Sequence, residues 1–194
     1  MKRGYSILYL SENFDGIRFE GKKVKQLYLG GEKIYQWTPK VKIDCLETET
    51  IQSGKKYLVD FPATSGNFLL IPFPERKYTY EVPENQNKFS AEYAWEITES
   101  DGKYVFSVTV DDKKMYLYRT SKFVNSGYDI GLTDDLGSAT FWDAQRISST
   151  NKFRISHKKY RDTYYLRYYN ATRGWIASST AGSLSLYRTL ELDE

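Results

Sequence analysis

The chain has 194 residues and a formal net charge of +3 from 28 basic and 25 acidic side chains, which argues against a general attraction to nucleic acid. It contains one cysteine, so no intrachain disulfide can form. Its 18 Tyr, 10 Phe and 4 Trp residues favour half-buried strands over helices. We therefore predict an all-β protein that makes no direct contact with nucleic acid.

The first residues do not resemble a secretion signal. Residues 1–3 are basic, but the apolar run at residues 7–10 is too short and is followed at once by Glu12 and Asp15. No stretch approaches the roughly 20 apolar residues that span a bilayer. We expect a protein that is made and folded in a cytoplasm and is not inserted into a membrane.

The clearest local pattern is a β-hairpin over residues 24–37. Two alternating runs flank Gly30 and Gly31, and glycine supplies the positive φ angles that a two-residue hairpin turn requires. This turn predicts three cross-strand pairs, which are Leu27 with Ile34, Gln26 with Tyr35, and Val24 with Trp37.

Both faces of this hairpin are apolar, although a strand pair that covers only its own domain usually exposes one polar face. A lone hairpin is marginal in water, so it needs a preceding strand, the main domain or another chain as its partner. The alternative is that it simply packs on the rest of the molecule. We favour assembly with another chain through the apolar side chains Val24, Leu27, Leu29, Ile34, Tyr35 and Trp37.

A break at Thr38-Pro39 predicts a boundary between a module of residues 1–38 and a domain of residues 41–194. The pattern V-x-x-L-Y-L-G-G-x-x-I-Y-x-W, at residues 24–37, resembles short modules near the chain ends of structural proteins of tailed bacteriophages. The resemblance implies a protein of the virion, made in the host cytoplasm. It would be a head-decoration, fibre, or tail and baseplate component that assembles with other virion proteins or with itself.

The remainder of the chain contains three imperfect repeats. A Tyr-Leu pair recurs at residues 57, 116 and 165, and a small-residue run after each pair ends in a large aromatic. These aromatics are Trp95, Trp142 and Tyr187, and we predict that they pack in the core. The third repeat ends early, so we expect a strand at residues 41–45 to pair with the end of the chain and close the fold.

Three repeats of about four strands each resemble the β-trefoil family over residues 41–192. In that family a Tyr-Leu strand opens each repeat, and a buried aromatic followed two residues later by an apolar residue closes it, as Trp95 and Ile97 do. The Gln-x-Trp signature of the family's lectins is missing here. We predict a β-trefoil-like domain, with an irregular β-sandwich as the alternative.

Residues that would support catalysis are sparse. The single histidine, His157, falls in a basic run at residues 157–161 that we interpret as a solvated turn, and Cys45 has the pattern of a buried strand residue. The adjacent pairs Asp111-Asp112 and Asp134-Asp135 also suit turns, because neighbouring strand residues point to opposite faces. We predict no catalytic residue, no metal site and no cofactor.

Carbohydrate binding is the more plausible chemistry. Trp175 with Asn170, and Tyr128 with Asp129 one repeat earlier, combine an aromatic plate with a polar acceptor, as sugar sites do. Loops of this composition also occur on β proteins that bind no sugar. Two functions therefore remain open: a virion structural protein that contacts host surface polysaccharide, or a carbohydrate-binding trefoil module of a bacterial protein.

Overall fold

The chain folds almost entirely into strands. The computed structural model describes residues 18–19, 22–23, 26–29, 31–36, 40–43, 50–63, 66–72, 89–90, 93–124, 127–148, 150–170 and 174–191. These residues form seventeen strands and short 3-10 turns, one of them at Leu136–Ser138. The all-β prediction is confirmed. The chain divides into two compact units, Met1–Thr38 and Pro39–Glu194.

The first unit contains two short antiparallel pairs, and its strands are β1 (Arg18–Phe19), β2 (Lys22–Lys23), β3 (Gln26–Leu29) and β4 (Glu32–Gln36). β1 pairs with β2, and β3 pairs with β4. Leu29 lies opposite Glu32, and Gly31 has a φ of 89°, so the two-residue turn at this place is confirmed.

The register of this hairpin differs from the prediction away from the turn. Leu27 lies opposite Tyr35, and Gln26 lies opposite Gln36, because the register shifts between Leu27 and Tyr28. Ile34 is the extra residue in β4, as in a β-bulge, and the predicted pairs of Leu27 with Ile34 and Gln26 with Tyr35 are therefore wrong. The predicted pair of Val24 and Trp37 lies outside the described residues.

The second unit contains thirteen strands, namely β5 (Lys40–Ile43), β6 (Lys55–Ala63), β7 (Gly66–Leu69), β8 (Phe89–Ser90), β9 (Trp95–Ser100), β10 (Lys103–Val110), β11 (Lys113–Val124), β12 (Gly127–Thr133), β13 (Asp143–Arg146), β14 (Lys152–Lys159), β15 (Asp162–Asn170), β16 (Gly174–Ser178) and β17 (Leu184–Glu191). Tight turns join many of them. Asp111 and Asp112 turn the chain from β10 to β11 with φ angles of 49° and 61°, which confirms that this carboxylate pair lies in a turn.

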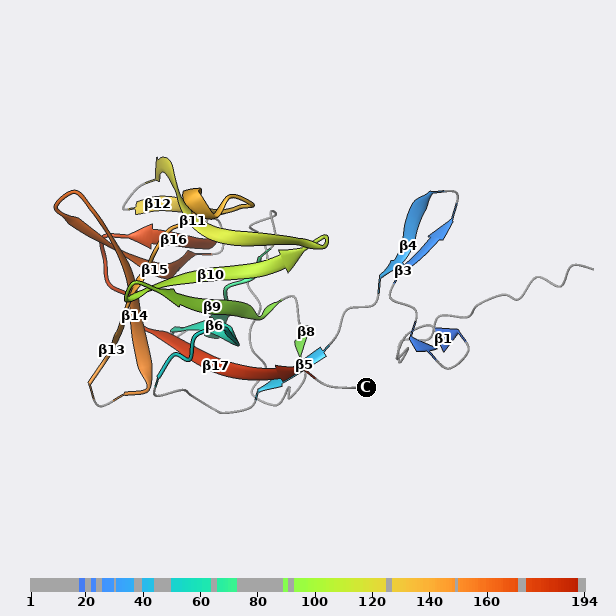
Figure 1. The fold of residues 1–194 in the computed structure, drawn as a ribbon. Helices are drawn as coiled ribbons and strands as arrows, with labels where there is room; N and C mark the ends of the chain where they lie inside the picture. Colours follow the sequence, from blue (N-terminus) through green and yellow to red (C-terminus); the bar gives the residue numbers. More distant parts are fainter. Residues whose placement is uncertain are drawn as a thin grey trace, which may run out of the picture. The chain divides into compact units, whose positions relative to one another are not determined.

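Nine of these strands form a closed β-barrel (Figure 1). Their order around the barrel is β14, β15, β16, β12, β11, β10, β9, β6 and β17, and β17 then pairs with β14. All of the pairings are antiparallel, so neighbouring strands run in opposite directions around the ring. Nine is an odd number, and an odd number of straight strands cannot alternate in direction all the way round. Some strands must therefore bend. β14 accordingly pairs with β17 at Lys152–Phe153 and with β15 at Ser156–Lys159.

A shorter ring of six strands runs through β13. The backbone N–H and C=O of Trp142, just before β13, exchange hydrogen bonds of 2.8 Å with those of Tyr104 on β10. β13 also pairs with β14, so β6, β9, β10, β13, β14 and β17 form a closed ring with an even number of strands. We call this ring the six-strand circuit.

The two ends of the second unit lie together, because β5 pairs with the end of β17. Ile43 lies opposite Thr189, and Val41 lies opposite Glu191. The prediction that a strand near residues 41–45 pairs with the end of the chain is confirmed. Cys45 lies outside the described residues.

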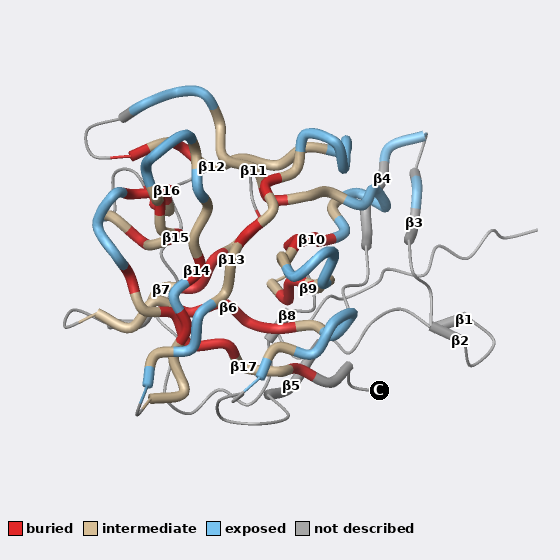
Figure 2. Tube along the Cα trace, turned by 60° about the vertical axis from the view of Figure 1, so that its left-hand side comes forward, coloured by how far each residue is buried: buried red, intermediate tan, exposed pale blue. Residues whose placement is uncertain are grey.

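The core fills the barrel between the strands. Figure 2 shows buried segments along the middle of the strands and exposed segments at the turns. Trp95 and Trp142 are 1% and 0% exposed in the main hydrophobic cluster, so their predicted place in the core is confirmed. Tyr187 instead lies half-buried against a second, smaller cluster around Leu58 and Leu69.

Replacing each buried tryptophan by phenylalanine separates hydrogen bonding from packing. The Trp95 indole N–H donates to the Leu70 carbonyl at 2.7 Å, whereas Trp142 Nε1 has no hydrogen-bond partner in the described chain. We expect Trp95→Phe to lower the free energy of unfolding by about 1–2 kcal/mol more than Trp142→Phe. Trp142→Ala should cost about 3–5 kcal/mol, as emptying a large buried site does. Urea denaturation measures these losses, and equal losses for the two Phe variants would contradict the assignment.

Candidate functional site

The four residues that the sequence singled out for sugar binding lie on three neighbouring strands. Tyr128 and Asp129 lie on β12, Trp175 lies on β16, and Asn170 lies at the exposed end of β15. β12 pairs with β16, with Tyr128 opposite Ala177, so Tyr128 and Trp175 share one face two residues apart. The topology therefore brings these strands together, although the two aromatic rings have different neighbours.

Trp175 is fixed inside an aromatic group. Its indole N–H donates to the Leu69 carbonyl at 3.1 Å, and its ring meets those of Phe61 and Tyr168 at 6.3 and 6.4 Å between centroids. Tyr168 in turn stacks on Phe68 at 4.0 Å. These contacts hold β16 against β7, and the role of Trp175 as a sugar platform stays a prediction.

Tyr128 lies among cations and other aromatic rings. The Arg119 guanidinium carbon is 4.3 Å from the centroid of the Tyr128 ring, and Lys159 Nζ is 5.3 Å from it. Phe123 and Tyr164 meet the same ring edge-on at 5.1 and 5.0 Å. We call these five residues, which come from β11, β12, β14 and β15, the Tyr128 cluster.

The Tyr128 cluster carries more positive than negative charge. Lys122 Nζ lies 3.8 Å from Oδ2 of Asp129, which is 2% exposed. Arg119 and Lys159 form no ion pair with any carboxylate of the described chain, and the buried Nε of Arg119 has no acceptor there. Burial raises the pKa of Tyr164, and the hydrogen bond with Tyr128 adds to this shift, so this phenol stays neutral at physiological pH.

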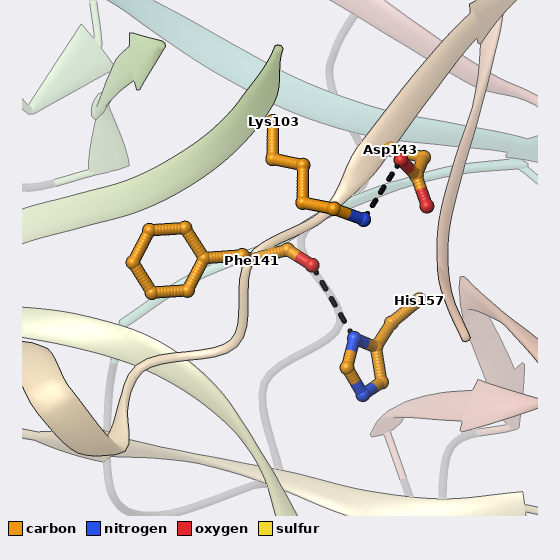
Figure 3. Close-up of polar contacts among 4 residues, drawn as sticks. All are labelled: Lys103, Phe141, Asp143 and His157. Carbon is orange, nitrogen blue, oxygen red and sulfur yellow. Dashed lines mark hydrogen bonds and ion pairs between the residues drawn. The ribbon is translucent and has the colours of Figure 1, made fainter. Parts of the chain in front are cut away.

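The single histidine lies beside Phe141, Lys103 and Asp143 (Figure 3), and the charge of Arg119 also acts on it. His157 is on β14, half-buried, with Nδ1 3.3 Å from the Phe141 carbonyl, beside a Lys103–Asp143 ion pair of 3.0 Å. The prediction that His157 is exposed in a turn is wrong, because β14 continues to Lys159 and the turn comes at the next residue. Burial, together with the charges of Arg119 and Lys103, lowers the His157 pKa.

A second buried polar group lies on β6. Asp60 is 0% exposed and lies opposite Ser185 of β17, which in turn lies opposite Lys152 of β14. Neither of its carboxylate oxygens has a hydrogen-bonding partner of good geometry in the described chain. Burial raises the Asp60 pKa to about 7, although the Lys152 charge and the nearby backbone N–H groups of Phe68 and Phe61 act in the opposite direction.

Sequence reasoning missed Arg119, Phe123, Tyr164 and Asp60. No local pattern marks them, because the Tyr128 cluster depends on the pairing of β12 with β16, and the position of Asp60 depends on the pairing of β6 with β17, both between strands far apart in the sequence. In the sequence, Lys159 could be recognised only as a member of the basic run at residues 157–161. The β14–β15 turn at residues 160–161 is confirmed within that run.

The described part of the chain gives few further functional indications. No group of three or more His, Cys, Asp or Glu side chains in it is arranged to hold a metal ion. Nor does any helix among these residues have the length and hydrophobicity needed to cross a bilayer. Comparison of the chain with protein-family models, with curated proteins and with solved structures finds no match.

The raised pKa of Asp60 predicts that its effect on stability depends on pH. A carboxyl whose pKa is raised by folding stabilises the protein below its unfolded value near 4, and this stabilisation is lost as the pH rises through 7. We expect the free energy of unfolding of Asp60→Ser, relative to that of the parent, to increase between pH 4 and pH 8. The increase should be on the order of 4 kcal/mol. Urea denaturation across this range measures it, with Asp134→Ser at an exposed carboxyl as control, and a constant difference for Asp60→Ser would contradict the prediction.

Proposed function

We propose that residues 41–194 form a β-trefoil-like domain, and the six-strand circuit supports this fold. In a trefoil the first and fourth strands of the three repeats form a six-strand barrel, and the inner strands form hairpins. Here β6 and β9, β10 and β13, and β14 and β17 would be those outer pairs. The inner strands are paired into the hairpins β10–β11–β12 and β14–β15–β16, and β6 continues into β7.

Equivalent residue pairs recur in the three proposed repeats. The pairs that join first and fourth strands are Tyr57 with Trp95, Tyr104 with Trp142, and Phe153 with Leu184. The pairs that join the first and second strands are Asp60 with Leu69, Ser107 with Tyr116, and Ser156 with Tyr165. This alignment replaces Tyr187 by Leu184 and places the second and third Tyr-Leu pairs in second strands. At the position of the buried Asp60, each of the other two proposed repeats has a serine.

We propose that the chain is a structural protein of a tailed-bacteriophage virion, and that its second unit contacts glycans on the host surface. The Tyr128 cluster carries the binding part of this proposal. Phe123 is 58% exposed beside the fixed Tyr128 ring, so apolar faces and polar groups lie together, as a sugar requires. The hairpin of β3 and β4, in a compact unit of its own, supports the assembly part.

The second candidate is a carbohydrate-binding module of a bacterial protein. The Tyr128 cluster supports it equally, and the first unit distinguishes the two candidates. A virion protein needs residues 1–38 for incorporation into particles, whereas a binding module needs only its sugar site. Phage structural genes beside the coding sequence would favour the virion, and carbohydrate-utilisation genes would favour the module.

Glycan binding should depend on Tyr128. On an array of bacterial surface polysaccharides, we expect Tyr128→Ala to weaken binding at least about tenfold, since stacking and orienting contacts are lost. Phe123→Ala should weaken it less, and Tyr28→Ala, at an exposed tyrosine of the first unit, should leave it unchanged. Thermal melting checks that each variant is folded. Binding that survives Tyr128→Ala would refute this site, and no binding by the parent would refute a glycan-contacting role.

The first unit should be dispensable for folding and required for assembly. We expect a chain lacking residues 1–38 to keep a cooperative thermal transition, because the barrel and its β5–β17 closure lie entirely in the second unit. It should no longer associate with its partner or with itself. Light scattering and incorporation into particles measure this. Loss of the thermal transition, or normal assembly of the shortened chain, would each contradict the proposal.

A further inference from the structure

The Tyr128 cluster holds two cations that form no ion pair with any carboxylate of the described residues. Arg119 lies over the Tyr128 ring, and its backbone N–H donates to Thr140 Oγ1 at 2.7 Å, which fixes the start of the side chain. Lys159 approaches the same ring from β14. Tyr164, 9% exposed, supports the ring edge-on from β15. Four strands therefore position the two positive groups before any ligand arrives.

The hydrogen-bonding capacity of Arg119 is largely unused. A guanidinium has five N–H donors, and within the described chain Nη1 donates to the Thr120 carbonyl at 3.2 Å while the buried Nε has no acceptor. A buried donor without an acceptor lowers the stability of the fold by about 1–3 kcal/mol. A fold that keeps such a donor despite this loss points to a role for the residue beyond stability. Lys122 offsets the charge of Asp129, and Asp162 lies opposite Lys159 in the pairing of β14 with β15, so the three cations around the cluster still outnumber these two carboxylates.

We propose that Arg119, Lys159 and Tyr128 bind the carboxylate of an acidic sugar, so that the ligand is an acidic polysaccharide. The inference rests on the proposed glycan-contacting function and names the ligand class. The planar guanidinium pairs bidentately with a planar carboxylate, and Lys159 adds a second positive charge. Phe123 and Tyr160, 58% and 93% exposed, offer apolar surface to the sugar ring that an inorganic anion would not use.

His157 provides a built-in reporter for this site. It is the only histidine of the chain, so its imidazole proton signals need no assignment among others. Burial is the main cause that lowers its pKa; the hydrogen bond with the Phe141 carbonyl and the Asp143 charge raise it, and the charges of Arg119 and Lys103 lower it further. A carboxylate bound at Arg119 offsets one of the positive charges. The His157 pKa should then rise, whereas a ligand bound elsewhere leaves it unchanged.

The test compares acidic polysaccharides with their own neutral forms. Polygalacturonate, alginate, hyaluronan and polysialic acid are titrated into the full chain, alongside carboxyl-reduced samples of each and inorganic phosphate. At least one acidic polymer should bind, more weakly at high salt, and should raise the His157 pKa. Its reduced form should bind at least about tenfold more weakly.

Matched variants locate the site. Arg119→Gln and Lys159→Gln should each weaken binding of the acidic polymer at least about tenfold. Arg119→Lys should restore only part of it, because the charge returns without the planar fork. Lys113→Gln, at the exposed β10–β11 turn, serves as the control and should bind like the parent.

The other possible outcomes all overturn the inference, and they differ in whether the glycan-contacting function also fails. Equal binding of acidic and reduced polymers, or binding of neutral glycans alone, overturns the inference and leaves the glycan-contacting function standing. No binding of any glycan overturns both. Phosphate that binds as tightly as the acidic polymer, with the same dependence on Arg119, overturns the sugar assignment. Acidic binding that survives Arg119→Gln and Lys159→Gln places the site elsewhere and also overturns the inference.

Discussion

The barrel depends on one strand, β17, which pairs with three others. It pairs with β6 through residues 185–188, with β14 through residues 184–185, and with β5 near its end. Both the nine-strand barrel and the six-strand circuit pass through it, so loss of β17 opens both at once. Its contacts join distant parts of the chain, such as the Thr189 hydroxyl and the Lys56 carbonyl, 133 residues apart. Chain entropy opposes such contacts until the intervening strands are in place, so we expect β17 to dock late in folding.

Asp60 and Arg119 have different consequences because their surroundings differ. Asp60, on β6, is fully enclosed by the neighbouring strands. Ionising its carboxyl therefore lowers the stability of the fold, and no solvent or ligand can reach the charge to stabilise it. Arg119 is only half-buried, and its neighbours Lys122 and Phe123 are exposed. A half-buried side chain whose Nε is buried can still present its remaining N–H groups to a ligand, whereas an enclosed carboxyl cannot meet one. The enclosed Asp60 therefore makes stability depend on pH, whereas the partly exposed Arg119 is a candidate binding residue.

Local patterns predicted the strand content and the turn at Gly31, which aromatic content and glycine positions decide. The core positions of Trp95 and Trp142, and the long-range pairing of β5 with the end of the chain, were predicted from recurring sequence patterns instead. Details that depend on neighbours could not be predicted. The extra residue Ile34 shifts the hairpin register without any mark in the alternation, and the basic run hides the end of β14, where His157 is half-buried. Tyr-Leu pairs recur in sequence although the first lies in β6 and the others in β11 and β15.

The candidate site lies where two strands that are far apart in the sequence meet. β12 pairs with β16, whereas among the described strands β7 pairs only with β6. This pairing needs a close backbone approach: a Cβ added at Gly127 would lie 2.2 Å from the Ala177 carbonyl oxygen. Glycine there lets β12 reach β16 and carries Tyr128, the next residue, towards Tyr164 and Lys159. The close approach at Gly127 therefore explains why this place on the barrel gathers aromatic rings, together with cations that form no ion pair within the described residues.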